Sequence, residues 1–537
     1  MARALVCLCA LICAAAAVPP IGTQPEQVHI SYPGVKNSMV VTWSTSNQTE
    51  SVVEYSVWGD ALFRKKAKGN YTVFTDGGTE NRTTYVHRVT LTDLRPGSAY
   101  VYHCGSDAGW SDVLYLTSLN ESLSFSPRFA LYGDMGNENP QSLSRLQKET
   151  QIGMYDAILH IGDFAYDMHE DNGRIGDEFM KQIESIAAYV PYMTCPGNQE
   201  WAYNFSHYRY RFSMPGHTEN LWYSWNIGPA HIISFSTEVY FYLEYGLDLL
   251  FRQYEWLKKD LEEANRPEQR AERPWIITMA HRPMYCSDDD GDDCTHFQSY
   301  VYNGSFEEPY VNPKAPVHII TGSAGCREKH DGFIPKPRSW SAFRSTDYGY
   351  TRMHLINSTH LYLEQVSDDQ SYSSLDIFSL NKNGCFECMN FNKSTDGTWG
   401  SLYKTQELMF YQALDLVFQT QKQHGAYSGI IDAQIAAFLW TGSATDQRHD
   451  LYSSEVSSGR DLGRRRLVFP LGRVVYKRKI RKCSLNSSEE LWEIMTNELQ
   501  QLFNVKSIYW KRYVADAGLV PSGQDGVSGS RQLMLKV

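Results

Sequence analysis

Short runs of alternating apolar and polar residues fill the chain from about residue 22 to residue 120. Val28–Tyr32, Met39–Trp43 and Tyr100–His103 are examples, and turn residues such as those of Asp93–Gly97 separate them. This alternation is typical of strands with one buried face, and regularly spaced turns are typical of a β-sandwich. We therefore expect an all-β N-terminal sandwich over residues 22–120. It contains no cluster of ligating or nucleophilic residues, so its expected role is structural.

From about residue 127 to residue 370, short apolar runs alternate with longer amphipathic stretches. The strand candidates are Phe129–Tyr132, Ala157–Ile161, His231–Phe235, Trp275–Met279 and Val317–Ile320. The helix candidates are Ser142–Met154, Asp177–Val190 and Leu247–Ala264. This order predicts an α/β domain of layered β-sheets flanked by helices. Tyr348–Leu355 and His360–Gln365 then predict a returning β-meander.

Residues 371–537 form an atypical tail of uncertain structure. Arg464–Lys482 is strongly basic, and Ser522–Ser530 is rich in glycine and serine. Asn486–Leu502 predicts an amphipathic helix with a Ser/Glu start. Because the net charge of the chain is −11, we favour a solvated segment over a nucleic-acid or heparin site for the basic run, and expect no nucleic-acid partner.

The N-terminus has the pattern of a secretion signal. Arg3 precedes the apolar stretch Ala4–Ala17, and Pro19-Pro20 follows it. The stretch is short for a membrane span, and no later segment has the roughly 18 consecutive apolar residues that one needs. We expect residues 1–17 to be a signal peptide and the mature chain to be secreted, extracellular or in the lysosomal lumen, without a membrane span.

Glycosylation sequons and cysteines agree with that compartment. Nine Asn-x-Ser/Thr sequons are candidate N-glycosylation sites: Asn47, Asn70, Asn81, Asn120, Asn204, Asn303, Asn357, Asn392 and Asn486. Eight of the 11 cysteines follow the signal and can form disulfides in an oxidising lumen, with the pairing left open. Cys385 and Cys388 are expected to be disulfide cysteines rather than zinc ligands.

Four polar motifs each follow an apolar run, and they predict a two-metal hydrolase site. Their residues are Asp134 with Gly136, Asp163 with Tyr166, Asn198 with Glu200, and His281. Strand ends hold side chains rigidly, so ligands from separate motifs can converge on hard cations. Asp163 is the candidate bridge between two ions, and Asp134, Asn198 and His281 are further ligands. A phenolate at Tyr166 would favour Fe(III).

The ordered motifs Asp134-x-Gly136, Gly162-Asp163-x-x-Tyr166, Gly197-Asn198-x-Glu200 and the strand ending in His281 resemble the signature of the purple acid phosphatases, within the calcineurin-like metallophosphoesterases. Leu94-x-Pro96-Gly97-x-x-Tyr100 resembles the fibronectin-type-III pattern, and such a front domain is similar to that of the long plant-type and animal plant-like members. The resemblance runs from about Pro25 to Gln370.

The resemblance implies an acid phosphatase that acts on phosphomonoesters. Asp134 and Tyr166 would hold Fe(III), and Asp163 would bridge to a divalent Zn, Fe or Mn ion held by Asn198 and His281. A metal-bound hydroxide, made acidic by the two cations, would attack phosphorus in line.

Two departures from the family pattern bear on activity. The family motif Gly-Asn-His-Glu/Asp reads Gly-Asn-Gln-Glu here, so Gln199 replaces a histidine that contacts phosphate, and Glu200 is a weaker catalytic candidate. Glutamine donates hydrogen bonds but is no acid near neutral pH. The family's Gly-His-x-His motif is absent, because no two of the 16 histidines are closer than six positions. We expect a segment to be missing near residue 297.

The leading hypothesis is a secreted, metal-dependent phosphatase. Three alternatives stay open: a catalytically impaired or inactive variant, a phosphodiesterase or nucleotide hydrolase of the same superfamily, and a non-enzymatic glycoprotein binding module. His296 and Asp288–Asp293 fill the interval where the missing motif is expected, and we expect them to form a solvated surface loop. The oligomeric state is not predicted.

Overall fold

The computed structural model describes residues 22–283, 287–288, 316–336, 341–370 and 374–381. The predicted signal peptide, the basic run and the predicted helix Asn486–Leu502 lie outside the described residues. So do His296 and the sequons at Asn303, Asn392 and Asn486. None of the helices described is long and apolar enough to cross a membrane.

The N-terminal part is a β-sandwich of two antiparallel sheets, as predicted. One sheet has the order β1-β2-β6-β5, and the other has the order β4-β3-β7-β8, with β9 also paired to β7. The strands are β1 (Glu26–Ser31), β2 (Met39–Thr45), β3 (Val52–Val57), β4 (Lys65–Lys68), β5 (Asn70–Thr75), β6 (Thr83–Leu91), β7 (Ala99–Ser106), β8 (Gly109–Trp110) and β9 (Leu114–Thr117).

The tight turn before β7 explains the Pro-Gly-x-x-Tyr pattern. Gly97 has a φ of 65°, which favours glycine, and the hydroxyl of the buried Tyr100 accepts a hydrogen bond from the main-chain N–H of Arg95 at 2.8 Å. Together with Trp43, Val53 and Val89, the ring of Tyr100 is completely buried in the sandwich core. The tyrosine thus fixes the turn to the core that the two sheets share.

The second part contains two further sheets. The six-stranded sheet has the order β12-β11-β10-β16-β17-β18, with β10, β11 and β12 parallel and the rest antiparallel. The three-stranded sheet has the order β13-β14-β15. The strands are β10 (Arg128–Tyr132), β11 (Ala157–Ile161), β12 (Tyr192–Cys195), β13 (Tyr223–Ile227), β14 (Ala230–Ser234), β15 (Trp275–Met279), β16 (Gly349–Leu355), β17 (His360–Ser367) and β18 (Ser374–Asn381).

Helices connect these strands and cover the sheets. They are α2 (Leu143–Gln151), α3 (Glu170–Ala187), α4 (Ala202–Arg211), α5 (Asp248–Ala264) and α6 (Pro267–Glu272), with 3₁₀ turns η1 (Asn198–Glu200), η2 (Glu238–Tyr240) and η3 (Leu243–Tyr245). The α-helices alternate with β10, β11, β12, β14 and β15 along the chain, which gives the layered α/β architecture expected from the sequence.

Two expectations about this part are wrong. Val317–Ile320 is not a strand, since it pairs with none of the described strands, and the neighbouring Thr321 makes a single main-chain hydrogen bond, from the N–H of Gly133 after β10. The predicted domain end near residue 370 is too early, since β18 (Ser374–Asn381) pairs along its length with β17. The described part of the second domain therefore extends to Asn381.

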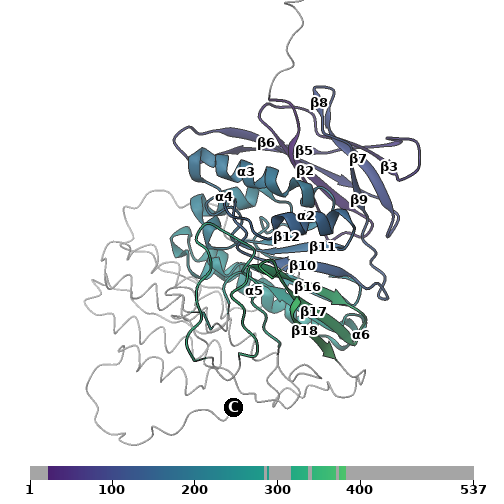
Figure 1. The fold of residues 1–537 in the computed structure, drawn as a ribbon. Helices are drawn as coiled ribbons and strands as arrows, with labels where there is room; N and C mark the ends of the chain where they lie inside the picture. The colour runs from purple at the N-terminus through teal and green to yellow at the C-terminus, as the bar shows by residue number, and fades with distance from the viewer. Residues whose placement is uncertain (1–21, 284–286, 289–315, 337–340, 371–373, 382–537) are drawn as a thin grey trace, which may run out of the picture. The chain divides into compact units, whose positions relative to one another are not determined.

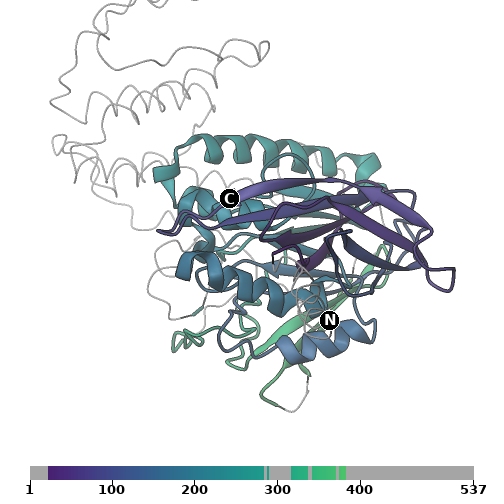
Figure 2. The same ribbon diagram turned by 90° about the horizontal axis from the view of Figure 1, so that it is seen from above.

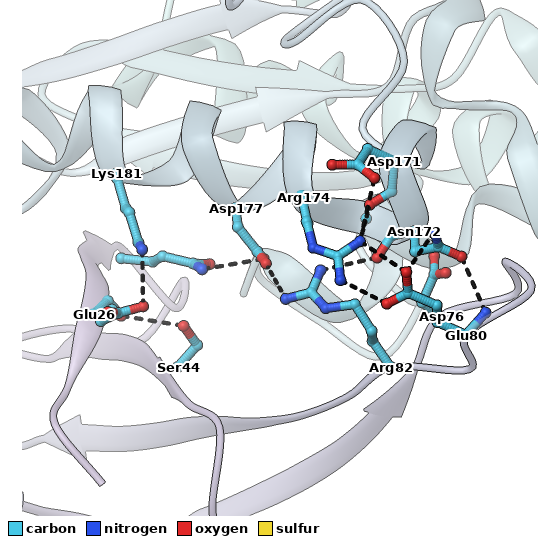
Figure 3. A network of polar contacts seen from close by, with 12 residues as sticks. Glu26, Ser44, Asp76, Glu80, Arg82, Asp171, Asn172, Arg174, Asp177 and Lys181 are labelled. Atoms are coloured by element: carbon cyan, nitrogen blue, oxygen red, sulfur yellow. Dashed lines mark hydrogen bonds and ion pairs between the residues drawn. The ribbon is translucent and has the colours of Figure 1, made fainter. Parts of the chain in front are cut away.

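Helix α3 lies between the sandwich and the six-stranded sheet (Figure 1). Seen from above, the purple strands of the sandwich cover the central part of the second domain (Figure 2). The contact is highly polar (Figure 3): Arg82, immediately before β6, donates to Asp177 at 2.7 Å and to the carbonyl of Asn172 at 2.8 Å, and Lys181 pairs with Glu26 at 3.1 Å. The sandwich thus holds the helix that follows the Gly162–Tyr166 motif.

Candidate metal centre

The candidate ligands lie just beyond the carboxyl ends of four strands. Asp134 follows β10, Asp163 follows β11 and Asn198 follows β12, and these strands are parallel neighbours. His281 follows β15 of the other sheet. One ligand atom from each of Asp134, Asp163 and His281 lies within 4.8 Å of the others. The structure therefore brings together residues that are as many as 147 positions apart in the chain.

Direct contacts join the predicted ligands. Nε2 of His281 lies 2.8 Å from Oδ1 of Asn198 and 3.4 Å from Oδ1 of Asp163. The hydroxyl of Tyr166 donates to Oδ1 of Asp134 at 3.1 Å. All five predicted ligands thus belong to one cluster, in which Tyr166 lies beside Asp134, and His281 beside Asn198 and Asp163.

A main-chain carbonyl orients the imidazole of His281. Its Nδ1 lies 3.0 Å from the carbonyl oxygen of Ile161. A carbonyl only accepts hydrogen bonds, so Nδ1 carries a hydrogen and Nε2 is the nitrogen that faces the other ligands. This is the arrangement that a metal-binding histidine needs.

Burial makes the cluster electrostatically costly without a cation. Burial raises the pKa of Asp134 to about 7, with the charge of Asp163 adding to the rise and His281 opposing it. Burial lowers the pKa of His281, but the carboxylates of Asp163 and Asp134 outweigh it and hold that pKa well above its ordinary value. Burial raises the pKa of Tyr166, and the negative charge of Asp134 raises it further.

The donor set matches hard or borderline cations. It consists of two carboxylates, a phenol, an amide oxygen and one imidazole, which are ligands that iron, zinc and manganese accept. Buried carboxylates this close together repel each other unless a positive charge lies between them. The cluster therefore has the chemistry of a metal site.

The main chain at the ligands is strained in a way that positions them. Asp134, Asp163 and Tyr166 have φ values of 58°, 52° and 56°, a region that non-glycine residues rarely occupy. A Cβ at Gly162 would lie 2.7 Å from Nδ1 of His281, and one at Gly197 would lie 2.1 Å from Oδ1 of Asp163. The two glycines are thus required because the loops approach each other closely.

Glu200 holds two of the ligand loops together. It is 2% exposed, and its carboxylate accepts hydrogen bonds from the main-chain N–H groups of Asp163, Phe164 and Gly197 at 2.9, 3.0 and 2.8 Å. Burial, then the charge of Asp163, raises its pKa to about 8. The sequence suggested a weak catalytic role for Glu200, whereas these contacts make it a positioning residue.

Gln199 and Tyr242 also touch the cluster through the main chain. The N–H of Gln199 donates to Oδ1 of Asp163 at 2.9 Å, so this residue adjoins the candidate bridging ligand as its motif position implies. The hydroxyl of Tyr242 donates to the main-chain carbonyl of Asn198 at 3.2 Å. Sequence reasoning missed Tyr242, because nothing in the segment after β14 shows that it returns to the Asn198 loop.

The other predicted modification sites are distributed over the surface. The described sequons at Asn47, Asn70, Asn81 and Asn357 are exposed, and those at Asn120 and Asn204 are half-buried. Cys104, Cys195 and Cys326 are buried free thiols. The expectation that all eight cysteines after the signal are available for disulfides is therefore wrong for these three. The other five lie outside the described residues.

Three family models match the chain in succession. That of the purple acid phosphatase N-terminal domain matches residues 25–118, that of the calcineurin-like phosphoesterases matches residues 127–320, and that of the iron/zinc purple acid phosphatase-like C-terminal region matches residues 315–376. Their order is the order of the sandwich and the two-sheet domain in the structure.

Known proteins give the same result. Acid phosphatase type 7 of Danio rerio is 70% identical over 417 residues, covering 69% of this chain and 94% of that protein. Fe(3+)-Zn(2+) purple acid phosphatase 12 of Arabidopsis thaliana is 26% identical over 419 residues, covering 68% and 86%. The structure of a purple acid phosphatase from yellow lupin seeds shares the fold, with a TM-score of 0.60 and 22% identity over 70% of this chain and 78% of that one.

The fold and the ligand cluster define a calcineurin-like metallophosphoesterase. Within that class, the chain belongs to the purple acid phosphatase family. The predicted fold class and family are confirmed, and so is the prediction that the chain is an enzyme of the phosphoesterase type.

Proposed function

We propose that this chain is a secreted acid phosphatase that hydrolyses phosphomonoesters at a dinuclear centre containing Fe(III) and a divalent Zn, Fe or Mn ion. The observation that carries the proposal is the convergence of Asp134, Asp163 and His281 within 4.8 Å. The Fe(3+)-Zn(2+) name of the Arabidopsis thaliana relative supports this choice of metals.

The chain would divide its ligands between two cations. Asp134 and Tyr166 would hold Fe(III), Asn198 and His281 would hold the divalent ion, and Asp163 would contact both. When bound, the cations supply Lewis acidity to the phosphoryl group and lower the pKa of water so that hydroxide is available as nucleophile.

The protein's own groups orient these ligands. Ile161 keeps Nε2 of His281 directed at Asn198 and Asp163. The N–H of Gln199 fixes Oδ1 of Asp163, and Glu200 ties the Asp163 loop to the Asn198 loop. The ligands are therefore preorganised, and little rearrangement is needed when cations bind.

We propose that turnover is slow in this chain. Gln199 would donate a hydrogen bond to the phosphoryl group, but it would supply no proton to the leaving oxygen near neutral pH. The missing Gly-His-x-His motif removes one imidazole from each cation. The alignment with the Danio rerio protein extends over 417 positions, whereas 69% of this chain is about 370 residues. The difference supports a segment missing from this chain, and the absent motif leads us to propose that it is missing near residue 297.

The experiment starts from the full-length chain expressed in secreting cells and purified from the medium. Elemental analysis is expected to find iron and a divalent metal, and p-nitrophenyl phosphate is expected to be hydrolysed faster than bis(p-nitrophenyl) phosphate. Asp163→Ala is expected to lose both metals and the activity, while Asp60→Ala, an exposed turn residue of the sandwich, keeps them.

The same measurements separate the alternatives. Bound metal without hydrolysis identifies the inactive variant, and a faster rate on the diester identifies a phosphodiesterase. A folded protein without iron or a divalent metal refutes the dinuclear centre. The remaining hypothesis is then the non-enzymatic glycoprotein binding module. Retention of the chain in the cell refutes secretion.

A further inference from the structure

An edge of aromatic side chains borders the candidate metal centre. Trp201 directly follows Glu200, and it is 38% exposed, while Tyr203 is 43% exposed. Tyr242 and His169 bring two further rings from other segments of the chain. Single exposed aromatic residues are ordinary, but here four rings from three segments gather beside the residues that carry the metal ligands.

The rings pack against one another, and two of them are partly exposed. Trp201 lies on Tyr242 with ring centroids 5.8 Å apart and an angle of 9° between the ring planes. His169 meets Trp201 edge-on at 6.1 Å and Tyr203 edge-on at 5.8 Å. Tyr203 is held in place from the sandwich side, since a Cβ at Gly77 would lie 2.6 Å from its ring. The rings therefore support one another, and Tyr203 also packs against the sandwich.

One carbonyl connects the stack to the metal centre. The main-chain oxygen of Asn198 accepts hydrogen bonds from the N–H of Trp201 at 3.3 Å and from the hydroxyl of Tyr242 at 3.2 Å. The side chain of the same Asn198 contacts His281 at 2.8 Å. Both stacked rings are thus attached to a residue whose amide oxygen belongs to the ligand cluster.

We propose that Trp201, Tyr203, Tyr242 and His169 form an aryl subsite that binds the leaving group of an aryl phosphomonoester while its phosphate lies at the metal centre. This proposal rests on the proposed phosphatase function and narrows its substrate class. An indole face attached to the Asn198 loop offers offset stacking to a planar leaving group. An alkyl phosphate has no ring to place there.

Stacking on an aromatic side chain changes affinity by about two- to tenfold. Phenylphosphonate and methylphosphonate carry the same phosphonate group and differ only in the ring, and neither is hydrolysed. Isothermal titration of the full-length protein with each ligand is therefore expected to give about fivefold tighter binding of phenylphosphonate. The ratio reports the aryl subsite alone, because the phosphonate contribution cancels.

Variants locate the subsite. Trp201→Ala is expected to reduce the ratio of the two dissociation constants to about one, with the methylphosphonate constant and the metal content unchanged. Trp201→Phe keeps a ring and is expected to keep most of the preference. Trp58→Ala is the matched control, since Trp58 is 62% exposed and lies in the sandwich.

Several outcomes overturn the aryl subsite: equal binding of both ligands by the wild type, equal weakening of both by Trp201→Ala, or no binding of either ligand. Metal analysis of the same samples tests the proposed function separately. A ring preference in a protein without metal refutes the dinuclear centre and supports the subsite. Bound metal together with methylphosphonate binding but no ring preference supports the dinuclear centre and refutes the aryl subsite.

Discussion

The carboxylate of Glu200 accepts a hydrogen bond from the main-chain N–H of Asp163 at 2.9 Å. It also accepts the N–H groups of Phe164 and Gly197, and so joins the loop after β11 to the loop after β12. The two loops carry the candidate bridging ligand and Asn198. A residue that contacts no ligand side chain directly therefore determines how two ligands face each other.

Glu200→Gln tests this relationship. The amide nitrogen that replaces one carboxylate oxygen cannot accept a hydrogen bond, so at least one buried N–H loses its partner. We expect the free energy of unfolding to fall by about 2 kcal/mol and the metal affinity to fall at least tenfold. Denaturant titration and metal titration measure the two effects.

The control for this variant is Glu219→Gln, since Glu219 is an exposed carboxylate whose partner is Arg209. It is expected to change neither quantity. If Glu200→Gln lowers stability but leaves the metal affinity intact, the two loops are held in register by other contacts.

Gln199→His restores an acid at the position next to Asn198. The main-chain N–H of residue 199 keeps its hydrogen bond to Asp163 in this variant, because the side chain is not involved. We expect the rate on p-nitrophenyl phosphate to rise at least tenfold, since a positioned general acid contributes roughly 10²–10⁴-fold. An unchanged rate with full metal occupancy would assign the defect to the missing Gly-His-x-His motif.

Asp177→Ala is expected to weaken the contact between the sandwich and α3. Asp177 accepts from Arg82 at 2.7 Å and from Arg211 at 2.8 Å, and the variant leaves both guanidinium groups without this partner, Arg211 in the interior. Removing one member of such a pair costs about 3–5 kcal/mol. Asp171→Ala, at an exposed pair with Arg174 on the same helix, is expected to have a much smaller effect, because water screens an exposed pair.

Denaturant unfolding of the two variants measures this difference. Burial raises the pKa of Asp177, but Arg211 and Arg82 outweigh it, so its pKa lies below the ordinary value. The contribution of Asp177 is therefore complete above the ordinary carboxyl pKa and is lost as the pH falls through the lowered one. Equal effects of Asp177→Ala and Asp171→Ala would show that the contact does not depend on this carboxylate.

Two buried histidines of the sandwich predict loss of stability in acid. Burial lowers the pKa of His87 to about 4, and the charge of Arg88 lowers it further. Burial also lowers the pKa of His29 to about 4; a hydrogen bond to the carbonyl of Gln27 opposes this shift, and the charge of Arg88 adds to it. The unfolded chain binds these protons first, so stability is complete above about pH 6.5 and falls toward pH 4. Each histidine is expected to contribute on the order of 2–3 kcal/mol of this loss at pH 4.

His87→Asn isolates one of these contributions. In the wild type, the ring of His87 contacts the hydroxyls of Thr45 and Ser51 at 2.8 Å, and asparagine retains polar atoms without titrating. Unfolding free energies between pH 7.5 and pH 4.5 are expected to fall less steeply in the variant. The same slope in both proteins would mean that other groups cause the acid sensitivity.

The convergence of most candidate ligands was predictable because of a simple geometric rule. Asp134, Asp163 and Asn198 each follow a short apolar run, and parallel strands place their carboxyl ends at one edge of a sheet. His281 was found in the same way, although its strand belongs to the second sheet. Local patterns were sufficient here, since each ligand is adjacent in sequence to the strand that positions it.

Other features depend on partners that the sequence does not reveal. The position of Glu200 depends on main-chain N–H groups as many as 37 residues away, and main-chain groups leave no signature in the sequence. Val317–Ile320 has the composition of a strand but pairs with none of the described strands. Ser374–Asn381 is the opposite case: the alternation Leu375-Asp376-Ile377 is too short to predict a strand by itself, and pairing with β17 forms one.

The hydrogen bond from His281 to the carbonyl of Ile161 crosses from the three-stranded sheet to the six-stranded one. The atom that orients the imidazole thus belongs to the strand that carries Asp163. Any sliding of β15 against β11 would misplace the histidine and break its link to the aspartate at the same time. Metal release is consequently expected to raise the rate of amide hydrogen exchange at the carboxyl ends of both β11 and β15, although the two strands belong to different sheets.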